Sequence, residues 1–227
     1  YNIDLAGKRV GIIGTGATAV QVVPEIAKTV GELYVFQRTP SSIDVRDQRA
    51  TTDEEYATWP TEENWAVKRR ERLALISAGR TALQGNDDFL SGKVTDFKKN
   101  RKQHNTELSP EELIQRQLNS NFRIMEQIRA RVDSIVEDPK TAAALKPYYP
   151  YGCKRPTFHD EYLPTFNLPH VHLVDTAPKG VELINERGIV HDGVEYPLDV
   201  LIYATGFVWV GTGSFNMITG RGGKTLK

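Results

Sequence analysis

The sequence has a single cysteine, Cys153, among its 227 residues. It cannot form an internal disulfide, and with five scattered histidines it lacks the ligand spacing of a four-coordinate zinc site. No run approaches the roughly 20 apolar residues that a membrane-spanning helix needs. The chain also has no excess of positive or negative charge, because 29 basic residues balance 29 acidic ones. We therefore expect no metal site, no membrane insertion and no nucleic-acid partner.

An initiator methionine and a signal-peptide pattern are also missing: the chain begins at Tyr1 and ends at Lys227, a few residues after a glycine-rich turn. We therefore expect a fragment of a longer, cytoplasmic protein. Hydrophobic residues make up 39% of the chain and charged residues 26%, which is typical of a soluble globular protein.

The first fifty residues have α/β character. Residues 9–13 form a short apolar run that predicts a strand buried on both faces. A glycine-rich turn, a helix over residues 17–30 and a second buried strand over residues 33–36 follow. Pro24 lies inside the predicted helix, where proline costs about 3 kcal/mol or introduces a kink.

The turn after the first strand has the sequence GTGATA over residues 14–19. Between a strand and a helix, this pattern predicts a dinucleotide site. Gly14 permits the tight turn, Gly16 lets the backbone approach a pyrophosphate, and Ala19 lets the helix pack closely on the strand. The pyrophosphate sits on the helix N-terminus. A glycine-rich turn without a ligand is the alternative.

The end of the second strand indicates which dinucleotide binds. An NAD or FAD site has Asp or Glu there to accept the ribose hydroxyls, but this chain has Gln37 followed by Arg38. A guanidinium binds a 2′-phosphate that a carboxylate would repel. The sequence therefore predicts NADPH rather than NADH, with a surface arginine at a strand end as the alternative.

Residues 51–147 lose the apolar runs, and we predict a mainly helical insertion there. Ser109, Pro110 and Glu112 predict a capped helix start. A downstream apolar stripe predicts one buried helix face, and it consists of Phe122, Met125, Ile128, Val132 and Ile135. We interpret the basic run over residues 98–102 as a solvated surface.

Strand patterns resume over residues 171–174, 181–184 and 200–204, and residues 188–190 with 194–196 predict a hairpin. The predicted fold class is α/β: a Rossmann-like NADPH-binding domain over residues 1–50 and 148–206, with the helical insertion between them. Residues 207–227 are expected to lead to a further domain.

Lys154 and Arg155 place two cations side by side before Pro156, which restrains Arg155 to extended geometry. The pair suits an anionic ligand, although such pairs are also common on surfaces. We interpret Cys153 as an ordinary thiol, and His159 with Asp160 as structural rather than catalytic.

Together these segments resemble the flavin-dependent Baeyer–Villiger monooxygenases. The resemblance rests on GKRVGIIGTG and VFQRTP within residues 7–40, on KRP and the block after it in residues 154–175, and on DVLIYATGF at residues 199–207. The family has one FAD domain and one NADPH domain. The resemblance implies that this chain is the NADPH domain with its helical insertion.

The resemblance also implies roles for individual residues. The pyrophosphate would be lined by Thr15, Gly16, Ala17, Thr18, Ala19 and Gln21, and the 2′-phosphate held by Arg38, Thr39 and Lys154. Arg155 falls on the family's catalytic arginine, a fixed cation for the anionic intermediates of ketone oxidation. The substrates would be a ketone and O2, and the partner would be the FAD domain of the parent chain.

Parts of the family pattern are missing from this sequence, among them the family's C-terminal flavin-domain segment. The sequence has neither the FAD-binding glycine motif nor the F-x-G-x-x-x-H-x-x-x-W-P signature. We therefore expect the chain alone not to oxygenate a ketone. Residues 157–163 are more similar to members that act on bulky or polycyclic ketones. The alternatives are a nitrogen- or sulfur-oxidising flavin monooxygenase and a non-catalytic NADP-binding module.

Overall fold

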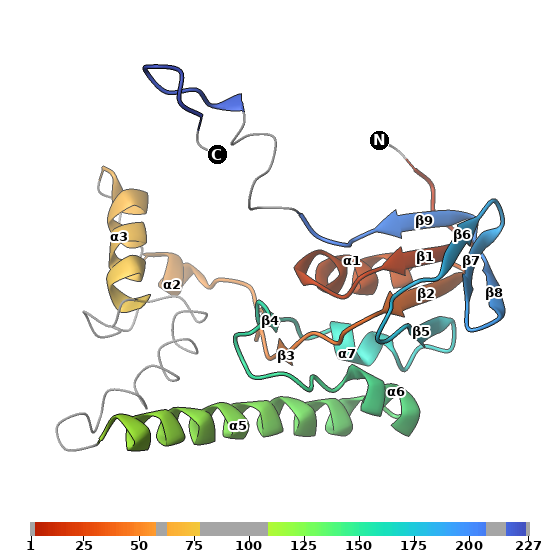
Figure 1. Cartoon of the computed structure of the whole chain (residues 1–227), viewed down its shortest axis with the longest axis horizontal. Helices are drawn as coiled ribbons and strands as arrows, with labels where there is room; N and C mark the ends of the chain where they lie inside the picture. Colours follow the sequence, from red (N-terminus) through yellow and green to blue (C-terminus); the bar gives the residue numbers. More distant parts are fainter. Residues whose placement is uncertain (1–2, 58–62, 78–108, 208–216, 226–227) are drawn as a thin grey trace. The chain divides into compact units, whose positions relative to one another are not determined.

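The computed structural model describes residues 3–57, 63–77, 109–207 and 217–225, and they fall into two compact units (Figure 1). Unit 1 comprises Tyr1–Ser41, Ile135–Leu145 and Glu161–Lys227. Unit 2 comprises Ser42–Ser134 and Lys146–Asp160. The predicted basic run over residues 98–102 lies outside the described residues.

Unit 1 is built on a four-stranded parallel sheet in the order β5-β2-β1-β9 (Figure 1). Its strands are β1 (Arg9–Ile13), β2 (Glu32–Gln37), β5 (Val171–Asp175) and β9 (Val200–Tyr203). The middle of the sheet is fully buried at Val10, Ile12, Leu33 and Val35. Burial on both faces explains why β1 and β2 are continuous apolar runs, as the sequence predicts.

A small antiparallel sheet adds the strands β6 (Leu183–Asn185), β7 (Gly188–His191) and β8 (Val194–Pro197). The predicted hairpin is therefore confirmed. The core of this part joins Phe36 of β2, Val174 of β5 and Ile189 of β7. Tyr196 packs its ring edge-on against Phe36 with 5.5 Å between the ring centroids. Aromatic packing thus attaches this sheet to the parallel one.

Helix α1 (Ala17–Ala27) follows β1 and ends earlier than the predicted residue 30. Pro24 lies within it and is buried, and the helix continues past it. After α1 the chain passes close to Gly7, because a Cβ on Gly31 would lie 2.5 Å from the Gly7 carbonyl oxygen. This close approach explains why residue 31 is a glycine.

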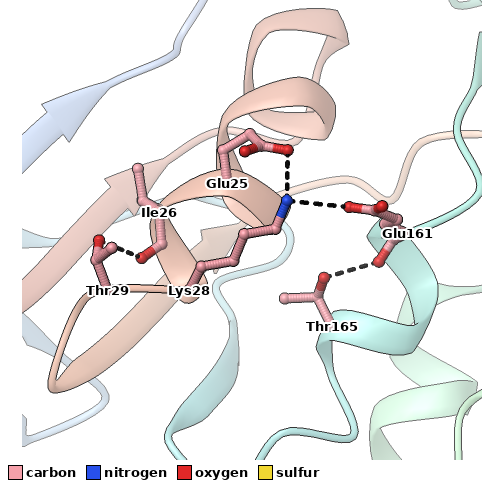
Figure 2. Close-up of polar contacts among 6 residues, drawn as sticks. All are labelled: Glu25, Ile26, Lys28, Thr29, Glu161 and Thr165. Atoms are coloured by element: carbon pink, nitrogen blue, oxygen red, sulfur yellow. Dashed lines mark hydrogen bonds and ion pairs between the residues drawn. The ribbon is translucent and has the colours of Figure 1, made fainter.

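The C-terminal end of α1 is tied to the short helix α7 (Tyr162–Thr165), as Figure 2 shows. Lys28 Nζ lies 2.8 Å from the Glu25 carboxylate and 3.5 Å from the Glu161 carboxylate. The Thr165 hydroxyl donates to the Glu161 carbonyl oxygen at 2.7 Å. One lysine thus links the end of α1 to the residue that precedes α7.

Unit 2 contains a two-stranded parallel pair, β3 (Ile43–Asp44) and β4 (Thr157–Phe158), and the helices α2 (Asp53–Ala57) and α3 (Trp65–Ser77). Its long helix α5 (Pro110–Ile135) has its last residue in unit 1. The predicted helix start is confirmed. The Ser109 N–H donates to the Glu112 carboxylate at 2.8 Å, and the Glu112 N–H donates to Ser109 Oγ at 3.3 Å.

One residue of the predicted apolar stripe of α5 is exposed rather than buried. Met125, Ile128 and Val132 are buried, but Phe122 is 57% exposed, so its predicted burial is wrong. A helix advances about 100° per residue, which puts Phe122 at the edge of the face that the other three share.

The unit boundaries differ from the predicted domain boundaries at several places, and residues 42–50, which were predicted to belong to the NADPH-binding domain, lie in unit 2. Helix α6 (Pro139–Leu145) lies in unit 1 rather than with the helical insertion, and the Gln37 side-chain amide donates to the Ala144 carbonyl oxygen at 2.8 Å. Residues 148–160, Lys154 and Arg155 among them, lie in unit 2. The assignment of these parts to functional domains stays a prediction.

An ion pair joins Arg9, the first residue of β1, to Asp199, the residue immediately before β9. The two residues are 190 positions apart in the sequence. Asp199 accepts hydrogen bonds from Arg9 N, Nε and Nη2 at 2.8, 3.1 and 2.7 Å, and the Asp199 N–H donates to the Arg9 carbonyl oxygen at 2.9 Å. The hydrogen bonds from Arg9 lower the pKa of Asp199 to about 2 from the ordinary value of 3.8. This pair fixes the register at the start of both strands.

We predict that Asp199→Asn lowers the melting temperature and flattens the acid limb of the stability profile. A carboxylate with a lowered pKa stabilises the fold fully above pH 3.8, and this contribution is lost as the pH falls toward 2. Thermal unfolding between pH 2 and 7 measures the effect. Asp192→Asn, in the turn between β7 and β8, is the control. Coincident profiles for wild type and Asp199→Asn would contradict the prediction.

Candidate functional site

The candidate site lies where β1 ends and α1 begins, at the carboxyl edge of the parallel sheet. Gly14 adopts a φ of +109°, and its N–H donates to the Phe36 carbonyl oxygen at 3.0 Å. A Cβ at this position would lie 2.4 Å from the Ala204 carbonyl oxygen. The tight turn at Gly14 is therefore confirmed, and its second cause is the close approach of the chain after β9.

Gly16 differs from Gly14 in having open space beside it. No atom lies within 4 Å of an added Cβ, and the residue is exposed. It is the N-cap of α1 and provides no side-chain cap, so the first N–H groups of the helix have no side-chain acceptor from it. Ala19 is completely buried, as its predicted packing role requires. The turn thus combines an accessible backbone with the positive end of a helix dipole.

Thr15 holds this turn against the chain that follows β2. Its hydroxyl donates to the Thr39 carbonyl oxygen at 2.7 Å, and its own carbonyl oxygen accepts a hydrogen bond from Ser41 Oγ. The side chain is therefore committed to a structural contact. The contact fixes Arg38 and Thr39 beside the turn. Sequence analysis missed Ser41, because no spacing links it to the glycine pattern.

The two residues at the end of β2 have opposite environments. Gln37 is 1% exposed and directs its amide to Ala144, and its Oε1 has no hydrogen-bond partner within the described ranges. Arg38 is exposed, and among the described residues no carboxylate forms an ion pair with it. The edge of the sheet therefore presents a cation and no competing carboxylate at residue 37.

The remaining predicted residues of unit 1 lie on α1. Ala17 and Thr18 form its first turn, and Thr18 is exposed. Gln21 is exposed too, and its side-chain amide folds back to donate to the Ala17 carbonyl oxygen at 2.8 Å. Unit 1 thus brings together the turn, the first turn of α1 and Arg38 with Thr39.

Lys154 and Arg155 lie in unit 2, in the chain before β4. Lys154 Nζ lies 5.4 Å from the centroid of the Tyr149 ring, within the range of a cation–π contact, and Arg155 is exposed. Cys153 is an exposed free thiol. Since these residues and Arg38 belong to different units, their predicted joint action on one ligand stays a prediction.

Asp160 has a structural role in unit 2. Its carboxylate accepts hydrogen bonds from the N–H groups of Arg46, Asp47 and Gln48 at 2.9, 3.1 and 2.9 Å. Burial raises the pKa of Asp160, but these backbone bonds outweigh burial, and the pKa is lowered overall. His159 donates its N–H to the Asp44 carbonyl oxygen at 3.0 Å. Both residues therefore hold the chain around β3 and β4.

Over the described ranges, no group of three or more histidine, cysteine or acidic residues could hold a metal ion. Among the helices of those ranges, none is long and apolar enough to cross a membrane.

Comparisons with known proteins identify relatives over almost the whole chain. No family model matches. The polycyclic ketone monooxygenase of Thermothelomyces thermophilus is 47% identical over 98% of this chain and 36% of its own length. The Baeyer–Villiger monooxygenase ATR8 of Stachybotrys chlorohalonatus is 46% identical over 90% of this chain and 33% of its own length. The chain thus spans about a third of these relatives.

Comparison with solved structures also finds similar proteins over almost the whole chain. That of the polycyclic ketone monooxygenase from Thermothelomyces thermophila matches with a TM-score of 0.78 at 47% identity, covering 98% of this chain and 37% of its own. That of OTEMO in complex with FAD and NADP matches with a TM-score of 0.67 at 29% identity, covering 99% of this chain and 42% of its own. The predicted α/β fold class is confirmed.

We predict unequal losses of stability for alanine at the two glycines of the turn. Gly14→Ala forces a side chain into a positive-φ conformation, which costs about 1–3 kcal/mol before the overlap with Ala204 is added. Gly16→Ala meets open space at an ordinary φ of −74° and costs only about 1 kcal/mol or less at the N-cap. Chemical denaturation of both variants measures the difference. Equal destabilisation would refute this account of the turn.

Proposed function

We propose that this chain, which is related over nearly its whole length to Baeyer–Villiger monooxygenases, is the NADPH-binding part of such an enzyme. The complete protein would insert one oxygen atom of O2 into a bulky or polycyclic ketone to give an ester or lactone. The observation that carries the proposal is the open, uncapped turn at Gly16 beside the exposed Arg38. We propose a cytoplasmic location as well.

The proposed pyrophosphate site is the N-terminus of α1. The N–H groups around Ala17 and Thr18 and the helix dipole favour an anion there, and the space at Gly16 allows it to approach the backbone. Thr15 would contribute through its main chain, since its hydroxyl donates to Thr39. Gln21 would line the same turn of the helix.

The proposed 2′-phosphate site is the end of β2. Arg38 supplies a fork of N–H donors that matches phosphate oxygens, and Thr39 lies beside it. Gln37 has no charge, and its amide donates to Ala144. The absence of a carboxylate at residue 37 removes the group that would accept the ribose hydroxyl of NADH and repel the phosphate of NADPH. Lys154 would add a second cation from unit 2.

Arg155 is proposed as the catalytic cation. Bound NADPH would supply the hydride that reduces FAD, and FAD would be held by a part of the protein outside this sequence. An arginine stays protonated throughout, so it stabilises developing negative charge without giving up a proton. Pro156 restrains the Arg155 backbone and thereby limits where its guanidinium reaches.

We predict that Arg38→Ala lowers the affinity for 2′,5′-ADP by about 10- to 100-fold and leaves that for 5′-ADP within about twofold. The expected loss is that of one charge-assisted hydrogen-bond pair, roughly 1.5–3 kcal/mol. Calorimetric titration of the complete protein measures both affinities, and Arg187→Ala on the β6–β7 turn is the control. Equal affinity of the wild type for the two ligands would overturn the proposal.

We further predict that Arg155→Ala in the complete protein lowers kcat for ketone oxygenation by about 100-fold or more while FAD and NADPH remain bound. The loss reflects a preorganised charge removed from the reacting centre. Steady-state kinetics with product analysis measures it. Lys154→Ala is the matched comparison: its expected effect is a raised KM for NADPH with kcat largely kept. Intact oxygenation in Arg155→Ala would contradict the assigned role.

A further inference from the structure

The loop after β5 runs beside the end of β2. The Thr176 N–H donates to the Gln37 carbonyl oxygen at 2.7 Å, and the Gly180 N–H donates to the Thr176 carbonyl oxygen at 2.7 Å. Thr176 itself is buried. These bonds continue the β2–β5 register, in which Gln37 lies opposite Asp175, and they hold residues 176–180 next to the proposed 2′-phosphate site.

Gly180 lies near the side chain of Arg38. An added Cβ at Gly180 would lie 3.6 Å from Arg38 Cδ, and the residue has a φ of +90°. The Arg38 side chain therefore passes close to this loop at Gly180. Lys179 is the residue immediately before Gly180, so its backbone is adjacent to the Arg38 side chain.

The charges around this contact favour an anion. Lys179 is exposed, and within the described ranges no carboxylate forms an ion pair with it. Asp175 is the acidic residue at the start of the loop, and its Oδ1 already accepts the Ala177 N–H at 3.0 Å. Arg38 and Lys179 thus bring two positive charges to one edge of unit 1.

We propose that Lys179 is a further cation for the 2′-phosphate of NADPH, in addition to Arg38 and Lys154, and a determinant of cofactor specificity, an inference that rests on the proposed function. A phosphate monoester carries about 1.5 to 2 negative charges at pH 7, more than one guanidinium neutralises. Arg38 gives directed hydrogen bonds, and the flexible lysine supplies a point charge. Arg38 and Lys179 both belong to unit 1, so this unit would contribute two of the cations that distinguish NADPH from NADH.

The test is calorimetric titration of the complete protein with 2′,5′-ADP and with 5′-ADP. We expect Lys179→Ala to weaken 2′,5′-ADP binding about five- to tenfold and to leave 5′-ADP within about twofold, and Lys179→Arg to restore most of the loss. Lys8→Ala is the matched control, since Lys8 precedes β1 and lies at the opposite, amino edge of the parallel sheet. It should behave as the wild type.

A pH series separates a charge role from a structural one. The second pKa of a phosphate monoester is about 6, so the ratio of wild-type to Lys179→Ala affinity should shrink between pH 7.5 and pH 5. If the wild type prefers 2′,5′-ADP and Lys179→Ala binds it equally well, this inference is overturned and the proposed function stands. If the wild type shows no preference for 2′,5′-ADP, both are overturned.

Discussion

The close approach of three chain segments at the carboxyl edge of the sheet is the constraint on which unit 1 depends. Gly14 lies against the Ala204 carbonyl group on one side and donates to Phe36 on the other. Thr15 then joins the turn to Thr39. The ends of β1, β2 and β9 are thereby fixed together, and the open space at Gly16 is left in a rigid frame. Rigid placement of a binding backbone lowers the entropy lost when a ligand binds.

The charged residues of the two units have different proposed roles. Unit 1 carries Arg38 and Lys179 with the helix dipole, which are the groups suited to the phosphates. Unit 2 carries Lys154 and Arg155, and the latter is proposed for the reaction itself. In unit 2 the carboxylate of Asp160 accepts hydrogen bonds from three backbone N–H groups and thereby orders the chain around β3 and β4.

Local patterns predicted most of unit 1, because they have local causes. Strands buried on both faces leave continuous apolar runs, and the glycine spacing reflects the turn. In unit 2, the capping box at Ser109 is local in the same way, because it lies within four residues. Contacts distant in sequence could not be predicted this way. The bond from Gln37 to Ala144, which ties α6 to unit 1, spans 107 positions, and no periodicity encodes it. The roles of Lys154 and Arg155 came from the family resemblance, since adjacent cations alone fit a surface equally well.

The pairing of β1 with β9 has a consequence for how the chain is made. Strand β1 is synthesised before β9, one of its two neighbours, which is separated from it by 190 positions. Contacts so far apart in sequence form late and slow the folding of a domain. Until residues 200–203 leave the ribosome, one hydrogen-bonding edge of β1 is without its native partner, and an unpaired strand edge invites association with other chains. Between the synthesis of β1 and that of β9, the nascent chain is therefore exposed to such association.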